Sequence, residues 1–393
     1  MSYLEPMEGE DSLGVNELTN QEIDRYSRHL LLPQVGLGGQ SRLKASKVLI
    51  IGAGGLGAPA ALYLAAAGVG RLGLVDFDTV EASNLQRQII HATKDVDRPK
   101  VASAKDKLKA LNPLIEVDTY SVKLSSRNAE KIFSDYDLIV DGTDNYPTRY
   151  LINDVCVFQK KPNVYASIFQ FEGQASVFGA LNGPCYRCLY PSPPPPGLVP
   201  SCGEGGVMGV LPGVMGAIQA AEAIKIIVKG AEGLIGRLLL FDAWSMRFNE
   251  VRLEKDPQCP VCGQSPTITE PIDYEKFCGL REKVDDMAQP IEASVLKKRL
   301  DSGDDLQIID IREPHERSLY PFKWAKAMPF GQLVRRIDEL KPNQDLVFIC
   351  KIGQRSLFAI RALRQAGYQG PMYNLHNGLT AWAKLVGDPP PPY

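Results

Sequence analysis

The stretch KVLIIGAGGLG at residues 47–57 constrains the fold of this chain more than any other part of its sequence. A short apolar run leads into a glycine-rich turn, and an apolar, alanine-rich segment of helical length follows. A strand, a glycine turn and a helix in this order open a βαβ unit. Since parallel strands need such crossover connections, the stretch predicts an α/β fold with a mainly parallel sheet.

The same turn predicts a nucleotide site in a Rossmann-like domain. Gly52 to Gly57 match G-x-G-x-x-G, and Asp76 ends the next predicted strand, near the spacing at which an acid holds a ribose hydroxyl. Glycines let phosphate oxygens approach the amides at a helix N-terminus. The motif also occurs where a strand and a helix simply pack closely. Its most frequent ligand is NAD, so a nicotinamide oxidoreductase is one interpretation.

Charged residues beyond Asp76 fit a triphosphate better. Arg87 follows the next turn and Lys100 starts a later predicted helix, so both could neutralise charge on an α-phosphate and a leaving pyrophosphate. Asp144 ends a further predicted strand and could hold Mg²⁺. Each residue alone could be a solvated surface charge. Together they favour ATP chemistry, because a dehydrogenase needs none of them.

Length and composition set the domain count and the partners. The chain of 393 residues is long enough for two or three domains, and its net charge of −2 gives no general attraction to nucleic acid or anionic membranes. The acidic N-terminus lacks the layout of a signal peptide, and no apolar run approaches the roughly 20 residues that span a bilayer. These features predict a cytoplasmic protein.

Turn-rich stretches and changes in the predicted elements divide the chain into successive parts. A hairpin is predicted over residues 166–179 and a long helix over 213–230. A turn-rich, charged stretch then precedes a second α/β pattern. We expect an arm at 1–22, the nucleotide domain at 23–265, a linker at 266–289, a second α/β domain at 290–388 and a tail at 389–393.

Four of the eight cysteines form two C-x-x-C pairs, which are Cys185 with Cys188 and Cys259 with Cys262. Each pair can present two thiolates from a tight turn, and two pairs complete the tetrahedral shell of one Zn²⁺. In a chain predicted to be cytosolic, metal binding is favoured over disulfides or redox pairs. Four protein ligands leave no open position, so the zinc site would be structural.

Cys202 lies beyond a proline-rich segment, between that segment and the glycine-rich GEGGVMG. Fully extended, the segment from Cys188 could span at most about 40 Å, so Cys202 need not belong to the metal site. Two interpretations stay open: a small buried residue, or a thiol nucleophile on a flexible loop.

The second α/β pattern contains a cysteine loop. Helices are predicted over 293–303 and 333–341, and a strand over 345–350 leads through a short loop into a helix over 356–367. Cys350 ends the strand, and the polar loop with Gly353 predicts that its sulfur is accessible. Backbone amides, the helix dipole, Lys351 and Arg355 would all stabilise a thiolate or an anionic persulfide.

The stretches RYSRHLLLPQVGLGGQSRLKASKVLIIGAGGLG, DFDTVEASNLQRQ, DGTDN and GEGGVMG resemble the ubiquitin-activating-enzyme-like adenylyltransferases, in particular those that activate the molybdopterin-synthase and thiamine sulfur carriers. The resemblance runs from about residue 25 to residue 263. It implies that Arg28 reaches into the nucleotide site of a homodimer partner. It places the acyl-accepting cysteine of some members at Cys202. It implies that ATP contacts Gly55, Asp76, Ser83, Asn84, Leu85, Gln86, Arg87, Lys100, Asp144 and Asn145.

The second domain resembles the rhodanese family through IIDIREPHE, CKIGQRS and NLHNGLTAW. Its loop from Cys350 to Arg355 is C-x4-R, one residue shorter than the C-x5-R loop of the related phosphatases, so sulfur transfer is favoured over phosphate-ester hydrolysis. Two departures occur: Asn377 stands where the family commonly has glycine, and the usual H-I-x-G-A run is absent.

Together these patterns predict an enzyme that adenylates the C-terminal glycine of a ubiquitin-like sulfur carrier and then forms its thiocarboxylate from a Cys350 persulfide. A cysteine desulfurase or thiosulfate would supply the sulfur, and the product would serve molybdopterin, thiamine or cysteine synthesis. One alternative is a conjugating enzyme that holds its carrier as a thioester at Cys202, although conjugation needs no rhodanese domain. A non-enzymatic scaffold would be expected to lack Cys350.

Overall fold

The computed structural model describes residues 17–194, 205–230, 233–279 and 288–392. The described residues form two compact units, one from residues 17–193 and 205–277 and one mainly from residues 278–392. The two units are described separately below.

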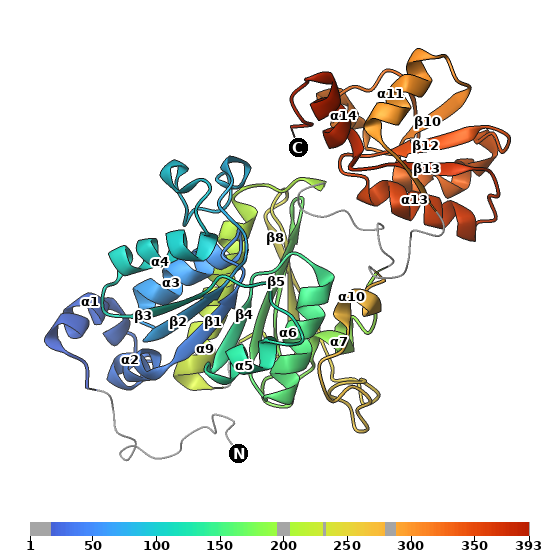
Figure 1. Ribbon diagram of the computed structural model, residues 1–393. Coiled ribbons are helices and arrows are strands. Elements are labelled where there is room, and N and C mark those ends of the chain that lie inside the picture. Colours follow the sequence, from blue (N-terminus) through green and yellow to red (C-terminus); the bar gives the residue numbers. More distant parts are fainter. Residues whose placement is uncertain (1–16, 195–204, 231–232, 280–287, 393) are drawn as a thin grey trace. The chain divides into compact units, whose positions relative to one another are not determined.

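The first unit is built on a sheet of eight strands in the order β3-β2-β1-β4-β5-β6-β7-β8 (Figure 1). Strands β3 to β5 in this order pair in parallel, and the last three pairs are antiparallel. The strands are β1 (Lys47–Ile51), β2 (Arg71–Val75), β3 (Glu116–Tyr120), β4 (Leu138–Asp141), β5 (Asn163–Phe169), β6 (Glu172–Phe178), β7 (Arg237–Asp242) and β8 (Arg247–Arg252). The predicted mainly parallel sheet and the hairpin of β5 and β6 are confirmed.

The helices of this unit connect and cover the sheet. They are α1 (Asn20–Leu30), α2 (Gly36–Ala45), α3 (Gly57–Ala67), α4 (Lys100–Leu111), α5 (Ala129–Ser134), α6 (Tyr146–Phe158), α7 (Tyr186–Leu189), α9 (Leu211–Lys229) and α10 (Tyr274–Phe277), with short 3₁₀ turns at η1 (Ala82–Asn84) and η2 (Thr93–Asp95). The chain runs outward from β1 to β3 and then crosses back to β4. The carboxyl ends of β1 and β4 therefore flank a switch point, where open α/β sheets bind ligands.

The apolar helix α9 is long enough to cross a membrane by length and composition. Most of it is buried, however, and it packs against α3, β5 and β6. Core residues such as Met215, Ala220 and Ile226 supply that buried surface. The length and apolar character of α9 thus match a helix that covers the sheet.

The second unit contains a parallel five-stranded sheet in the order β11-β10-β12-β13-β9. Its strands are β9 (Gln289–Ile291), β10 (Leu306–Asp310), β11 (Ala325–Ala327), β12 (Asp345–Ile349) and β13 (Met372–Leu375). Its helices are α11 (Ala293–Asp301), α12 (Pro314–Leu319), α13 (Gln354–Gln365) and α14 (Gly378–Val386), with 3₁₀ segments at η4 (Phe330–Gln332) and η5 (Val334–Glu339).

One predicted helix of this unit is wrong. Residues 333–341 were expected to be an α-helix, and the chain instead forms the 3₁₀ segment η5, interrupted at Arg336, where φ is −113°. Apolar residues are spaced for a helix here, but Leu333 and Leu340 are both drawn into the core. Packing at the two ends thus overrides local helical preference.

Candidate functional sites

Two glycines of the turn, Gly52 and Gly57, leave no room for a side chain. Gly52 has a φ of 92°, which favours glycine, and a Cβ on Gly57 would overlap the carbonyl oxygen of Gly52. Gly55 lies against Pro212 of α9, whose Cβ is 3.2 Å from the position that a Gly55 Cβ would take. The turn therefore brings bare backbone to the N-terminus of α3, as phosphate binding requires.

Asp76 and Lys100 lie beside this turn. One carboxylate oxygen of Asp76 accepts a hydrogen bond from the Ala53 amide at 2.8 Å, and burial raises the pKa of Asp76. The buried Lys100 ammonium forms a 2.8 Å ion pair with Asp78. Asp78 was missed in the sequence, although it follows the same strand as Asp76. The pair fixes the lysine at the edge where a nucleotide would bind.

The segment from Ser83 to Arg87 lies just beyond, around η1. Ser83 and Gln86 are exposed, whereas Asn84, Leu85 and Arg87 are half-buried. Arg87 donates to the Ser83 carbonyl at 3.4 Å, and its Cγ is 3.7 Å from the position of a Gly55 Cβ. The structure thus brings Arg87 next to the glycine turn.

The loop after β4 carries Asp144 and Asn145 at the other side of the switch point. Both are exposed, and Asn145 caps α6 by accepting from the Thr148 amide at 3.0 Å. Asp144 therefore lies directly before a capped helix and is exposed to solvent.

Three residues that the sequence did not single out shape this loop. The buried Asp141 accepts from the Thr143 amide and hydroxyl at 3.0 Å and 2.6 Å, and burial raises its pKa. Gln219 of α9 donates to the Asp141 carbonyl at 2.7 Å, and Arg149 donates to the Thr143 carbonyl at 2.9 Å. Gln219 carries no local sequence signal, because its partner is distant in the chain.

The four predicted metal ligands come together. The sulfurs of Cys185, Cys188, Cys259 and Cys262 all lie within 4.8 Å of one another. The distance is 3.6 Å from Cys185 to Cys259, 3.4 Å from Cys188 to Cys262 and 4.0 Å from Cys185 to Cys188. Zinc–sulfur bonds of about 2.3 Å in a tetrahedron give sulfur separations of about 3.8 Å. The cluster could therefore hold a metal ion such as zinc.

A buried charged network supports this cluster from α6. Arg187, between Cys185 and Cys188, is 1% exposed and donates to both carboxylate oxygens of Asp154 at 2.8 Å. The Tyr274 hydroxyl donates to the same carboxylate at 2.9 Å. The network joins the first C-x-x-C pair to α6 and α10.

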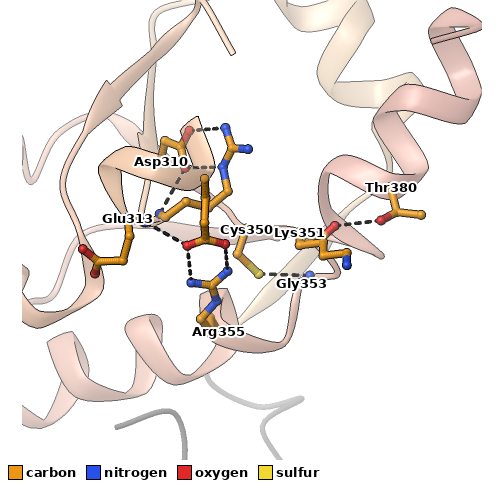
Figure 2. A network of polar contacts seen from close by, with 9 residues as sticks. Asp310, Glu313, Cys350, Lys351, Gly353, Arg355 and Thr380 are labelled. Atoms are coloured by element: carbon orange, nitrogen blue, oxygen red, sulfur yellow. Dashed lines mark hydrogen bonds and ion pairs between the residues drawn. The ribbon is translucent and has the colours of Figure 1, made fainter. Parts of the chain in front are cut away.

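The second unit surrounds Cys350 with backbone. The Gly353 amide donates to the Cys350 sulfur at 3.1 Å (Figure 2). Gly353 has a φ of 85°, and a Cβ on Gly378 would overlap the carbonyl oxygens of Cys350 and Lys351. The Thr380 amide and hydroxyl also donate to the Lys351 carbonyl, at 3.0 Å and 3.1 Å. The loop thus needs glycine at two points and packs on the start of α14.

The prediction of an accessible Cys350 is wrong, because the residue is 0% exposed. The polar loop folds around the sulfur and does not lift it into solvent. Arg355 also differs from expectation: it donates to both oxygens of the buried Glu316 at 2.8 Å and 2.6 Å. Its charge is therefore largely neutralised, and the Gly353 amide is the group that donates to the sulfur.

Two further residues stay predictions. Arg28 is exposed in the last turn of α1, and its contact with a homodimer partner is an expectation from the sequence. Cys202 lies outside the described residues.

Asn377, the departure from glycine, adopts the left-handed conformation with a φ of 55°, which asparagine tolerates.

A glycine turn beside Lys100 in one unit, and a loop in the other whose Gly353 amide donates to the Cys350 sulfur, indicate an adenylyltransferase joined to a sulfurtransferase. Residues 26–261 match the ThiF family and residues 292–385 match the rhodanese-like domain. The chain belongs to the ThiF family.

The chain is similar to one relative whose name gives both activities and to one whose name gives adenylylation alone. The chain is 47% identical over 380 residues to the "Probable adenylyltransferase/sulfurtransferase MoeZ" of Mycobacterium tuberculosis, covering 94% of this chain and 95% of the relative. It is 54% identical over 269 residues to the sulfur carrier protein adenylyltransferase of Thermus thermophilus, covering 67% and 99%. Among solved structures, the chain is similar to Escherichia coli MccB in complex with MccA-N7isoASN, with a TM-score of 0.55 and 23% sequence identity. The match covers 64% of this chain and 76% of the MccB chain, and it supports the fold.

Proposed function

We propose that the chain adenylates the C-terminal glycine of a ubiquitin-like sulfur-carrier protein and then converts it to a thiocarboxylate. The observation that carries the proposal is that one chain contains both a glycine turn flanked by Lys100 and Asp144 and a loop in which a backbone amide donates to the Cys350 sulfur. The name of the Mycobacterium tuberculosis relative supports the same pair of activities, and that of the Thermus thermophilus relative supports the adenylylation of a sulfur carrier.

In the first step, a carboxylate oxygen of the carrier attacks the α-phosphorus of ATP and pyrophosphate leaves. Arg87, whose Cγ is close to Gly55, and the buried Lys100 would stabilise the charge that develops in this transfer. Asp144 would hold Mg²⁺, which supplies further charge neutralisation. Arg28 would complete the site from the partner of a homodimer.

In the second step, the terminal sulfur of a Cys350 persulfide attacks the acyl carbon and AMP leaves. Attack by the Cys202 thiolate on the Cys350 sulfur of the resulting acyl disulfide then releases the thiocarboxylate. A disulfide between the two cysteines remains, and a cellular thiol reduces it. The sulfur donor would be a cysteine desulfurase or thiosulfate. The carrier would serve molybdopterin, thiamine or cysteine synthesis.

Carrier-dependent exchange between ATP and pyrophosphate tests the first step. The experiment uses each candidate carrier in turn, and a carrier without its terminal glycine is the control. Absence of exchange with every carrier would reject the proposal. A Cys350→Ala variant should keep the exchange and lose thiocarboxylate, as measured by the mass of the carrier. An unchanged thiocarboxylate yield would reject the role of Cys350.

The metal assignment has its own test. We propose that the four cysteines hold one structural Zn²⁺, since they supply four closely spaced sulfurs and leave no ligand position open. Elemental analysis of the purified chain should find one zinc per chain. Replacing Cys262 by Ser should lower that ratio, and a protein without stoichiometric zinc would contradict the assignment.

A further inference from the structure

The buried side chain of His91 contacts two segments of the proposed nucleotide site. It is 7% exposed, its Nε2 lies 3.0 Å from the Ala53 carbonyl oxygen, and its Nδ1 lies 2.9 Å from the Ser103 hydroxyl. Ala53 belongs to the glycine turn, and Ser103 lies one helical turn after Lys100 in α4. A single imidazole therefore joins the turn to the helix that carries the lysine.

The contact between His91 and the Ala53 carbonyl shows which ring nitrogen carries a hydrogen. A carbonyl oxygen only accepts hydrogen bonds, so Nε2 of His91 donates to Ala53. Burial, together with the Lys100 charge, lowers the pKa of His91 against the opposing effects of Ala53, Asp76 and Asp95. The geometry of the Ala53 contact thus places a hydrogen on Nε2.

This hydrogen bond acts on the neighbouring amide. The Ala53 carbonyl and the Gly54 N–H belong to one planar trans peptide, so they point in opposite directions. Fixing the carbonyl toward His91 fixes the Gly54 N–H away from it. On the preceding peptide, the Ala53 N–H is held by Asp76 at 2.8 Å. The two peptides that begin the glycine turn are thus held by separate side chains.

We propose that His91 is a positioning residue for nucleotide binding, which orients the Gly54 amide through the Ala53 carbonyl and sets its spacing from Lys100 through Ser103. Nothing in this role requires His91 to touch the nucleotide or the reacting atoms. The inference rests on the proposed function of the glycine turn. It adds a residue that the G-x-G-x-x-G pattern does not contain.

Three substitutions separate the two contacts. His91→Phe keeps an aromatic ring at this position and removes both hydrogen bonds. His91→Gln keeps an N–H group near the position of Nε2. His91→Asn is shorter, so its amide reaches Ser103 and not Ala53. The Phe and Asn variants should raise KM for ATP about tenfold, the loss expected for one well-placed hydrogen bond. The Gln variant should stay within about threefold of the wild-type chain.

Carrier-dependent ATP–pyrophosphate exchange gives KM and kcat for each variant, and titration calorimetry gives Kd for ATP without any carrier. A positioning role raises KM and Kd while kcat at saturating ATP changes by less than about threefold. Loss of folded protein would lower kcat and leave KM unchanged. Should the Phe variant not fold, the comparison of Asn with Gln carries the same test.

The outcomes distinguish this inference from the proposed function. A wild-type chain that binds ATP and shows no exchange with any carrier rejects the function, while Kd still tests His91. A wild-type chain that is active, with an Asn or Phe variant of unchanged KM and Kd, overturns the role of His91. A Gln variant as impaired as the Asn variant would overturn it as well.

Discussion

The buried pair of Arg187 and Asp154 allows a quantitative prediction. Both side chains are 0% exposed, and Asp154 accepts two hydrogen bonds from Arg187, one from Tyr274 and one from Asn153. Replacing Asp154 by Ala removes all four and leaves the guanidinium buried without this carboxylate. Breaking a buried pair in this way costs about 3–5 kcal/mol. The cost should appear in α6, which carries Asp154, and in the first C-x-x-C pair.

Hydrogen exchange measured by mass spectrometry reports the free energy of opening for each segment. The loss of stability can therefore be measured in α6 even if the two units do not unfold together. Since about 1.4 kcal/mol is a factor of ten, the most protected amides of α6 should exchange roughly 100-fold to several thousand-fold faster. A double variant, Asp154→Ala with Arg187→Met, removes the stranded charge and should recover part of the protection. An increase below about tenfold, or a double variant worse than the single one, would refute the reasoning.

Three further changes have clear expected results. Removing the metal with a chelator should make the four clustered cysteines reactive toward Ellman's reagent, and unchanged thiol counts would contradict a metal site. Gly57→Ala should abolish ATP binding and lower the melting temperature, because its Cβ overlaps the Gly52 carbonyl, whereas Gly55→Ala, with its nearest neighbour at 3.2 Å, should still fold. Burial opposes ionisation of Glu316, yet hydrogen bonds from Arg355 hold its pKa below the usual range. This stabilisation is present above the unfolded value of about 4.3 and is lost as the pH falls through the lower folded value. Glu316→Gln should therefore weaken the pH dependence of melting between about pH 5 and pH 3, and an unchanged dependence would refute the pairing.

Local patterns explain what could be predicted from the sequence. The glycine turn is a contiguous motif, and the backbone geometry of Gly52 and Gly57 makes other residues unfavourable. The two C-x-x-C pairs were identified because each spacing is set by one short turn. Their meeting in space follows from the antiparallel half of the sheet, which the sequence indicated only as a hairpin.

Long-range contacts explain what could not be predicted. Glu316 lies 39 residues before Arg355, so the sequence suggested a free positive charge where the structure has an ion pair. Cys350 is buried because the start of α14, beyond β13, packs on its loop. His91 and Gln219 contact backbone carbonyl oxygens of distant segments. Since every residue has a backbone carbonyl, the amino-acid sequence gives no sign of such a contact.

The cysteine cluster also has a consequence for the unfolded chain. Cys185 and Cys259 are separated by 74 residues, so an ion held by both pairs would close a long loop that contains α9, β7 and β8. In the chain-entropy description of cross-links, closing a loop of this length lowers the conformational entropy of the denatured ensemble. The loss is worth about 4 kcal/mol of stability for the folded chain. A chain that unfolds with its ion still bound would thus begin refolding with this long-range contact already made. Depletion of the metal would then show first as poor recovery from unfolding, while molecules already folded continued to react.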